Sequence, residues 1–337
     1  MEFSVMLPRS AVVLLSLCLA VFCCQAASAA APLPVVVSIA PQKYMLERIA
    51  GDAVSVTVLV KPGSDPHAYE PTPGQMRAAG EAAAWFTIGV PFEEVWLPRI
   101  TGAAQQMRVI SSLKGITRLS FADEGRILAD LELTLDAQGR EPHDGKEEDD
   151  HDGHVHDHSG HGHSHGGPKG EDPHVWLSPM LVRRMLPGLA KELGALMPER
   201  AAAFRAGAAS FAEELERLDA ELAVRFSEFP RGQRVFLTFH PSWRYFAHNY
   251  QLTELSIEID GKEPGPKSLK AVTDTARRLG IRTVFVEPQF PKASAEAVAS
   301  AIGATVVVAD PLAEDLPALF SHMAEKLIES FKRQPPQ

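Results

Sequence analysis

The feature of this chain that most constrains its fold is an alternation of short β-branched runs with helix-like segments, present before residue 120 and again after Pro230. Short runs of β-branched and aromatic residues predict strands, and strands that alternate with helices indicate a parallel sheet with helices on its faces. The predicted strands are Val35–Ser38, Val54–Val60, Trp85–Ile88, Arg108–Ile110, Val235–Phe239, Thr283–Val286 and Thr305–Val308, and Glu254–Ile259 is an apolar–polar stretch. We therefore expect an α/β protein in which the C-terminal half repeats the α/β pattern of the N-terminal half.

A long helical pattern lies between the two sets of strands. From Ala201 to Phe229 apolar residues recur mostly every three or four positions, which predicts one amphipathic helix. Because no strand stands beside it in the sequence, we expect this helix to bridge the two halves. The other predicted helices are Gln42–Ala50, a helix that begins at Pro73 with Thr72 as its cap, Ser178–Leu196, Ser242–His248, Ser268–Leu279, Ala293–Ile302 and Leu316–Phe331.

The first 29 residues are typical of an export signal. Arg9 precedes an apolar run, Ala11–Phe22, and the small tripeptide Ala27-Ser28-Ala29 follows, as in cleavable signal peptides. The run is shorter than the roughly 20 residues of a membrane-spanning helix. We expect cleavage near Ala29, which removes all three cysteines, and a periplasmic location; lipid anchoring through Cys23 or Cys24 is the alternative.

Residues 141–171 predict a disordered His/Asp-rich loop. Of the net charge of −10, −8 falls between Glu141 and Asp172, where ten acids face two lysines. Such a composition cannot bury enough apolar surface to fold alone. The acidic balance of the whole chain argues against nucleic acid as a partner. The eight loop histidines, which we expect to bind metal as an auxiliary site, are His143, His151, His154, His156, His158, His161, His163 and His165.

The role of this loop stays open at the level of sequence. It could gather zinc and pass it inward, or it could sense or buffer excess metal. It could also be a tolerated surface insertion with incidental affinity.

Polar residues at the ends of predicted strands and loops form the candidate site. In open α/β sheets, ligands bind outside the carboxyl ends of the strands. Imidazole nitrogens together with a carboxylate oxygen suit Zn²⁺, which is usually held tetrahedrally. The candidates are His67, His174, His240, Glu287 and Asp310. Asp65 and Asp172 each stand two residues before a histidine, where either could orient the imidazole or merely cap its own turn.

Five segments around these residues carry a resemblance to a known family. They are Val37-Ser38-Ile39-Ala40-Pro41, Asp65-Pro66-His67-Ala68-Tyr69-Glu70, Asp172-Pro173-His174-Val175-Trp176-Leu177, Phe239-His240-Pro241-Ser242-Trp243-Arg244-Tyr245-Phe246 and Val284-Phe285-Val286-Glu287-Pro288-Gln289-Phe290. In this order they resemble the substrate-binding proteins of zinc/manganese ABC transporters, the ZnuA-like family also called cluster A-I or cluster 9. The resemblance extends from Leu33 to about Phe331.

The resemblance implies two Rossmann-like lobes with parallel sheets, joined by one long linking helix, with metal held in the cleft between the lobes. It divides the chain into a signal peptide (1–29), an N-terminal lobe (30–198), the linking helix (199–230) and a C-terminal lobe (231–337). The implied ligands are His67, His174, His240 and Asp310, with Glu287 as an outer or substitute ligand. The chain departs from the pattern at Trp85, where a small or acidic residue is expected, and in lacking cysteines for the C-terminal disulfide of zinc-specific members.

The implied function is capture of Zn²⁺ in the periplasm, by a monomer, and delivery to an ABC permease and its ATPase in the inner membrane. His240 offers nitrogen where a manganese-preferring site would offer a carboxylate, so Mn²⁺ is the less favoured ion. The alternatives are a zinc buffer without a transporter and a zinc hydrolase with Glu287 or Asp310 as general base. The sequence holds no H-E-x-x-H motif, and three histidines plus Asp310 would close the open position that catalysis requires.

Overall fold

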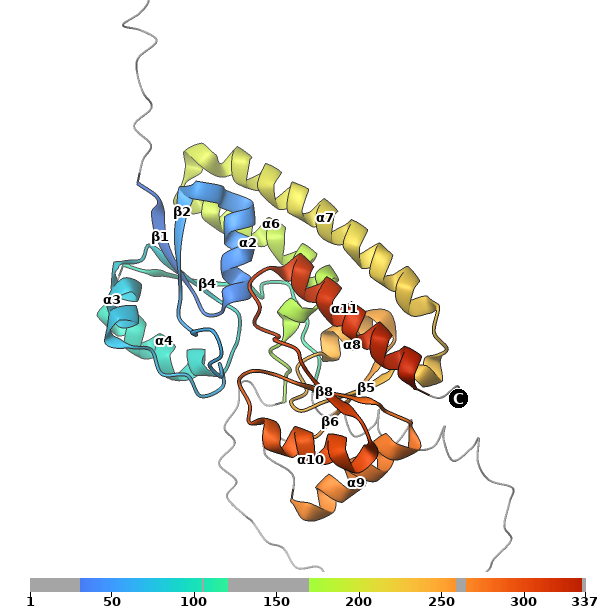
Figure 1. The fold of residues 1–337 in the computed structure, drawn as a ribbon. Coiled ribbons are helices and arrows are strands. Elements are labelled where there is room, and N and C mark those ends of the chain that lie inside the picture. The colour runs from blue at the N-terminus through green and yellow to red at the C-terminus, as the bar shows by residue number, and fades with distance from the viewer. Residues whose placement is uncertain (1–30, 105, 121–169, 259–264, 335–337) are drawn as a thin grey trace, which may run out of the picture.

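The computed structural model describes residues 31–104, 106–120, 170–258 and 265–334. It consists of two lobes, each built on a four-stranded parallel sheet, and the expected α/β fold is confirmed (Figure 1). The first sheet has the order β2-β1-β3-β4 and the second the order β6-β5-β7-β8. The predicted signal peptide and the eight loop histidines lie outside the described residues.

The strands are short and occur where β-branched residues cluster. In the N-terminal lobe they are β1 (Leu33–Val37), β2 (Val54–Val58), β3 (Ala84–Thr87) and β4 (Arg108–Ser111). In the C-terminal lobe they are β5 (Val235–Thr238), β6 (Thr253–Ser256), β7 (Thr283–Val286) and β8 (Thr305–Val308). The central strands β3, β5 and β7 are buried along their whole length, as expected for strands covered on both faces.

Helices connect consecutive strands and cover both sheets. They are α2 (Ala40–Ala50), α3 (Pro73–Glu81), α4 (Phe92–Ala103), α6 (Pro179–Leu196), α7 (Ala201–Ser227), α8 (Arg244–Tyr250), α9 (Pro266–Arg278), α10 (Lys292–Ile302) and α11 (Leu316–Arg333), with short 3₁₀ turns η1 (Gly51–Ala53), η3 (Val175–Leu177), η4 (Pro198–Arg200) and η5 (Arg231–Gln233). Thr72 caps α3 as predicted, because its hydroxyl accepts a hydrogen bond from the Gln75 amide at 3.4 Å. No helix in the described parts of the chain is long and apolar enough to cross a membrane.

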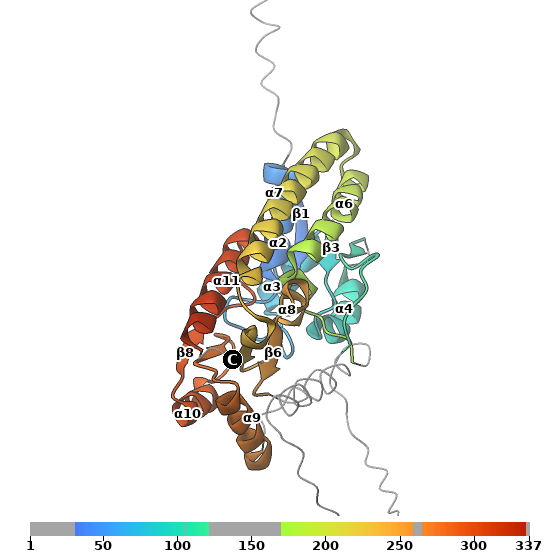
Figure 2. The same ribbon diagram turned by 90° about the vertical axis from the view of Figure 1, so that its right-hand side faces the viewer.

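Helix α7 joins the two lobes. It runs along the molecule from one sheet to the other and lies beside α6 in both views (Figures 1 and 2). Its predicted apolar stripe is buried except for Leu218, which is partly exposed. The buried members of the stripe are Phe204, Ala208, Phe211, Leu215, Leu222 and Phe226.

An apolar core continues from the N-terminal lobe into the C-terminal lobe. Near the end of α7, Phe226 packs edge-on against Phe246 of α8, with ring centroids 5.8 Å apart. Phe246 in turn stacks on Phe320 of α11 at 6.3 Å. The same core cluster includes Val36 of β1. Continuous apolar packing of this kind favours a fixed arrangement of the lobes.

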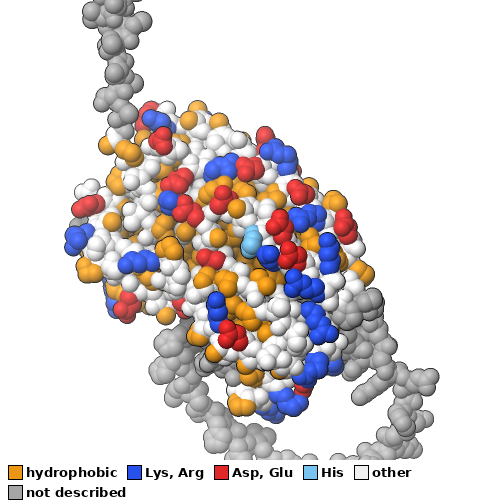
Figure 3. All heavy atoms as spheres, viewed as in Figure 1, with side chains coloured by type: hydrophobic (Ala, Val, Ile, Leu, Met, Phe, Trp, Pro, Cys, Tyr) orange, Lys and Arg blue, Asp and Glu red, His pale blue; other side chains and the backbone are white. Residues whose placement is uncertain are grey.

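On the face shown in Figure 3, acidic and basic side chains are interspersed. One ion pair, between Lys43 Nζ in α2 and Glu314 Oε1 just before α11, spans the two lobes at 2.6 Å. The side chains of both partners are partly exposed, so we expect this pair to contribute little to stability.

The structure explains the unexpected Trp85. Its indole is fully buried, and Nε1 donates to Ser38 Oγ at 3.0 Å. Ser38 Oγ in turn donates to the Glu93 carboxylate, which also accepts from the amides of Ile88 and Gly89 at 2.8 Å each. Trp85 therefore belongs to a buried polar network inside the N-terminal lobe.

The structure contains one helix and one strand that the sequence patterns did not predict. Helix α4 was not predicted, since Pro98 and Gly102 interrupt its pattern and its apolar residues lack a clear period. The apolar–polar stretch Glu254–Ile259, to which no element was assigned, contains most of strand β6, which ends at Ser256. This matters for the site, because Glu258 lies beyond the end of the strand.

Candidate metal site

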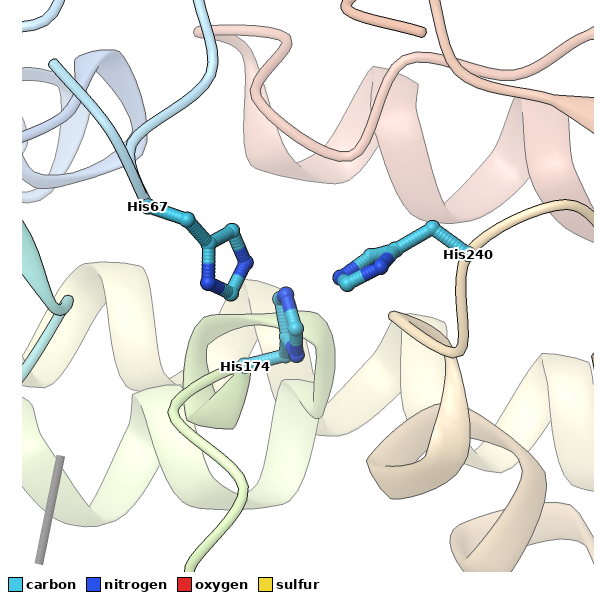
Figure 4. A group of neighbouring side chains, drawn as sticks. All are labelled: His67, His174 and His240. Carbon is cyan, nitrogen blue, oxygen red and sulfur yellow. The ribbon is translucent and has the colours of Figure 1, made fainter. Parts of the chain in front are cut away.

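Three histidines from distant parts of the chain converge between the lobes. His67 lies in the loop after β2, His174 immediately precedes η3, and His240 follows β5. One nitrogen of each ring lies within 4.8 Å of the other two, and the ring centroids are 5.0 to 5.8 Å apart (Figure 4). The three imidazoles that the sequence singled out therefore do come together.

His174 is held by the loop that precedes it. Asp172 Oδ1 accepts a hydrogen bond from the His174 backbone amide at 2.9 Å and also lies 2.7 Å from the ring nitrogen Nδ1. Both side chains are buried. Asp172 thus caps its turn and orients the ring, which leaves Nε2 as the free ligand atom of His174.

His67 is positioned differently. Asp65 Oδ1 accepts from the His67 backbone amide at 2.8 Å, so Asp65 caps the turn. The two Asp-Pro-His segments, which are identical in sequence, therefore differ in the contacts of their aspartates. Among the described residues, Asp172 also contacts the imidazole that follows it, whereas the hydrogen bond of Asp65 reaches the backbone of His67.

His240 is oriented by a residue that the sequence analysis missed. Glu258 Oε2 lies 2.6 Å from His240 Nδ1, and both side chains are buried. The Phe290 ring stacks on the other side of the imidazole, with centroids 5.0 Å apart and an interplanar angle of 29°. Glu258 was not among the candidates because Glu254–Ile259 was interpreted only as an apolar–polar stretch. A strand that ends at Ser256 places Glu258 just beyond a strand end, where ligands of parallel sheets bind.

Glu287 and Asp310 do not join the three-histidine group in the part of the chain that the structure describes. Glu287 is buried behind His240, where it accepts from Ser242 Oγ at 3.1 Å and from the His240 amide at 3.4 Å. Asp310 Oδ1 accepts from Gln289 Nε2 at 2.9 Å and from the Leu312 amide at 3.0 Å. Both carboxylates are therefore near the site and engaged by other groups.

The histidines line a small pocket together with residues of both lobes. Asp65 and Pro66 line it from the N-terminal lobe, and Gln289, Phe290, Pro311 and Leu312 line it from the C-terminal lobe. Trp176 also borders it and contacts the His174 ring at a centroid distance of 5.3 Å. Both lobes therefore contribute to the wall of the pocket.

Burial and neighbouring charges shift the pKa values of the three histidines in different directions. Burial lowers the pKa of His67 well below its usual value of 6.5, with smaller contributions in the same direction from His240 and His174. Burial also lowers the pKa of His174, despite the opposing Asp172. For His240 burial acts to lower the pKa, but the hydrogen bond to Glu258 and the charge of Glu287 together raise it. His67 and His174 are thus held in the neutral form that ligates metal.

The His240 ring shows most directly that the pocket suits a cation. Its Nε2 is buried and has no hydrogen-bond partner among the described residues. Leaving a buried polar atom unsatisfied costs about 1–3 kcal/mol, so such an atom in a native protein calls for an explanation. Three imidazole nitrogens that face one another supply what Zn²⁺ or a similar transition-metal ion requires.

Two Rossmann-like lobes that meet at a cluster of three histidines, of which His174 and His240 are buried and His67 is partly exposed, define a two-lobed metal-binding protein. The chain belongs to the family described as zinc-uptake complex component A, periplasmic (ZnuA), whose model matches residues 35–333.

Individual relatives are described as proteins that bind zinc or manganese. A solved structure of a ZnuA from which residues 138–173 of its own chain were deleted, with zinc bound, is 38% identical, covers 90% of this chain and all of that chain, and has a TM-score of 0.73. The zinc-binding protein AdcA of Streptococcus pyogenes is 25% identical over 82% of this chain. The manganese-binding lipoprotein MntA of Halalkalibacterium halodurans is 26% identical over 86% of this chain and 81% of its own length. The chain spans about half the length of AdcA.

Proposed function

We propose that this protein captures Zn²⁺ with high affinity in the periplasm and delivers it to an ABC permease and its ATPase in the inner membrane. The observation that carries the proposal is the convergence of His67, His174 and His240 from both lobes on one point. In this proposal the ion is cargo. It binds between the lobes and leaves when the permease docks.

We further propose that each histidine donates one ring nitrogen to the ion. Asp310 would supply the fourth ligand, with Glu287 as an outer or substitute ligand. Asp310 could do so through Oδ2, because its two described hydrogen bonds both reach Oδ1. A site completed in this way has no open position for substrate, which favours a carrier over an enzyme.

The choice of Zn²⁺ over Mn²⁺ rests on the donor set. Imidazole suits zinc, whereas carboxylates and water suit manganese, and nitrogen-rich sites also bind zinc more tightly on intrinsic affinity. Relatives of this chain include proteins described as zinc-binding and as manganese-binding. The choice of metal ion is therefore argued from the ligand atoms of this chain. His240 contributes nitrogen at the third position, which supports zinc.

The remaining parts of the proposal concern the whole chain. We propose a signal peptide over residues 1–29 cleaved near Ala29, lobes over 30–198 and 231–337, a linking helix over 199–230, and a monomer in the periplasm. The family description, a periplasmic component of a zinc-uptake complex, supports this location.

The decisive experiment is metal competition on the protein without residues 144–167, so that the loop histidines do not contribute. We expect calorimetry to show one tight zinc site, accessible also to Co²⁺, from which Mn²⁺ fails to displace Zn²⁺ except at a large excess. Comparable affinities for Mn²⁺ and Zn²⁺ would contradict the zinc assignment. Absence of any tight site would contradict the proposed function altogether.

A further inference from the structure

Glu258 reaches His240 through the register of two paired strands. In the second sheet β5 and β6 are parallel, with Thr238 opposite Ser256. His240 and Glu258 each stand two residues beyond this pair. Backbone hydrogen bonds continue past the strand ends, from the Ile257 amide to Thr238 O and from the Glu258 amide to Phe239 O, both at 2.9 Å. The backbone itself therefore places the carboxylate beside the imidazole.

The contact defines which nitrogen of His240 faces the other histidines. Glu258 Oε2 lies 2.6 Å from Nδ1 in a buried setting, and an ionised carboxylate can only accept a hydrogen bond. Nδ1 must then carry a proton, and in the neutral imidazole Nε2 keeps its lone pair. Nε2 is the buried atom without a partner among the described residues, and the His240 ring faces His67 and His174 (Figure 4).

Other buried carboxylates near His240 make different contacts. Glu254, on β6 itself, accepts from Thr238 Oγ1 at 2.9 Å and from the Trp243 amide at 3.1 Å. Glu287 accepts from the backbone amide of His240 and from Ser242 Oγ. In the contacts of the described residues, Glu258 is the carboxylate that touches the His240 ring.

Asp172 makes the equivalent contact with His174 from the other lobe. The two orienting carboxylates lie in different local settings: Asp172 is in a turn two residues before its histidine, and Glu258 is in the segment that follows the neighbouring strand β6. A carboxylate behind a ligating imidazole fixes its tautomer and strengthens it as a donor.

We propose that Glu258 is a positioning residue that fixes the tautomer and orientation of His240, so that Nε2 is presented to the metal ion. The inference rests on the proposed function, since it concerns how that site is prepared before an ion arrives. Its two parts, the tautomer in the metal-free protein and the effect on zinc, can be measured separately.

The test uses one substitution at two positions of the full-length mature protein, Glu258→Gln and, as a matched control on the same segment, Glu254→Gln. In metal-free wild type at pH 8, long-range ¹H–¹⁵N spectra should show His240 protonated at Nδ1. In Glu258→Gln the side-chain amide can either donate or accept, so we expect the Nε2-protonated form to appear. Zinc affinity should fall about tenfold or more, as for other orienting residues of metal ligands.

The control separates positioning from a general need for buried carboxylates. We expect Glu254→Gln to leave the His240 tautomer unchanged and zinc affinity within about threefold of wild type, since Glu254 does not contact the ring. An unchanged tautomer in Glu258→Gln would overturn the inference. So would an equal loss of zinc affinity in both variants. A wild-type protein that shows the Nδ1 tautomer but binds no zinc would instead contradict the proposed function.

Discussion

The indole Nε1 of Trp176 donates a hydrogen bond to the carbonyl oxygen of Pro311, 2.8 Å away, and thereby joins the two lobes at the edge of the histidine pocket. Trp176 follows His174 by two residues, and Pro311 follows Asp310. One buried hydrogen bond thus ties together the segments that carry a histidine of one lobe and a carboxylate of the other.

Trp176→Phe should lower the free energy of unfolding by about 1–3 kcal/mol, because it leaves the buried Pro311 carbonyl without its donor. Urea denaturation of the metal-free protein measures this directly. Trp96→Phe, on the partly exposed surface of α4, is the control and should change stability by less than about 1 kcal/mol. Equal effects of the two substitutions would show that the bond between the lobes contributes nothing.

Replacement of His67, His174 or His240 by Ala should weaken zinc binding by more than tenfold, which corresponds to over about 1.4 kcal/mol, because each removes a nitrogen donor. Asp310→Ala should cost less, since water or Glu287 can fill the fourth position. Competition with a chromogenic chelator gives the affinities. His322→Ala, at an exposed position of α11, is the control. Wild-type affinity in His240→Ala would remove His240 from the site.

Deletion of residues 144–167 should lower the number of zinc ions bound per chain and leave one tight site, because the three clustered histidines lie outside the deleted segment. Isothermal titration of the full-length and shortened proteins compares the two stoichiometries. A ZnuA relative that lacks residues 138–173 of its own chain is described with zinc bound, which agrees with this expectation. If the shortened protein retained only weak binding, the main site would be in the loop.

Gly207→Ala should destabilise the fold by about 1–3 kcal/mol, because a Cβ at this position of α7 would overlap the carbonyl oxygen of Ile49 at the end of α2. Gly188→Ala is the matched control within α6, where an added Cβ meets nothing within 4 Å. There the better helix propensity of alanine should stabilise by up to about 1 kcal/mol. Thermal denaturation should therefore shift in opposite directions for the two variants.

Glu93 should make the stability of the protein depend on pH. Burial raises its pKa to about 7 from a usual value of 4.5, against the opposing hydrogen bond from Ser38. The folded state therefore favours the protonated carboxyl. Its contribution to stability is complete below about pH 4.5 and is lost as the pH rises through about 7, in total on the order of 3 kcal/mol.

Glu93→Gln removes this titration. We expect the unfolding free energy of the variant to improve relative to wild type between pH 5 and pH 8, measured with urea at several pH values. The exposed neighbour Glu94→Gln should follow the wild-type profile. Parallel profiles for Glu93→Gln and wild type would show that Glu93 is ionised throughout this range.

Local sequence patterns determined the elements of the fold. Runs of β-branched residues placed the strands, and the apolar period of Ala201–Phe229 marked the linking helix that the structure shows as α7. Local signals failed where they were weak, as at α4, whose formation depends on what it packs against rather than on its own periodicity. The three histidines could be chosen because each follows a strand or a loop end, and such positions in parallel sheets lie on the side where ligands bind.

Tertiary structure alone decided what surrounds those histidines. Glu258 touches His240 because β5 and β6 pair with Thr238 opposite Ser256, and a register between strands cannot be read from either strand by itself. The same holds for Gln289, which reaches Asp310 across 21 residues of sequence, and for Trp176, which reaches Pro311 across 135. Residue types and local periods are written in the sequence, whereas the contacts that orient a ligand depend on how elements far apart in the chain pack together.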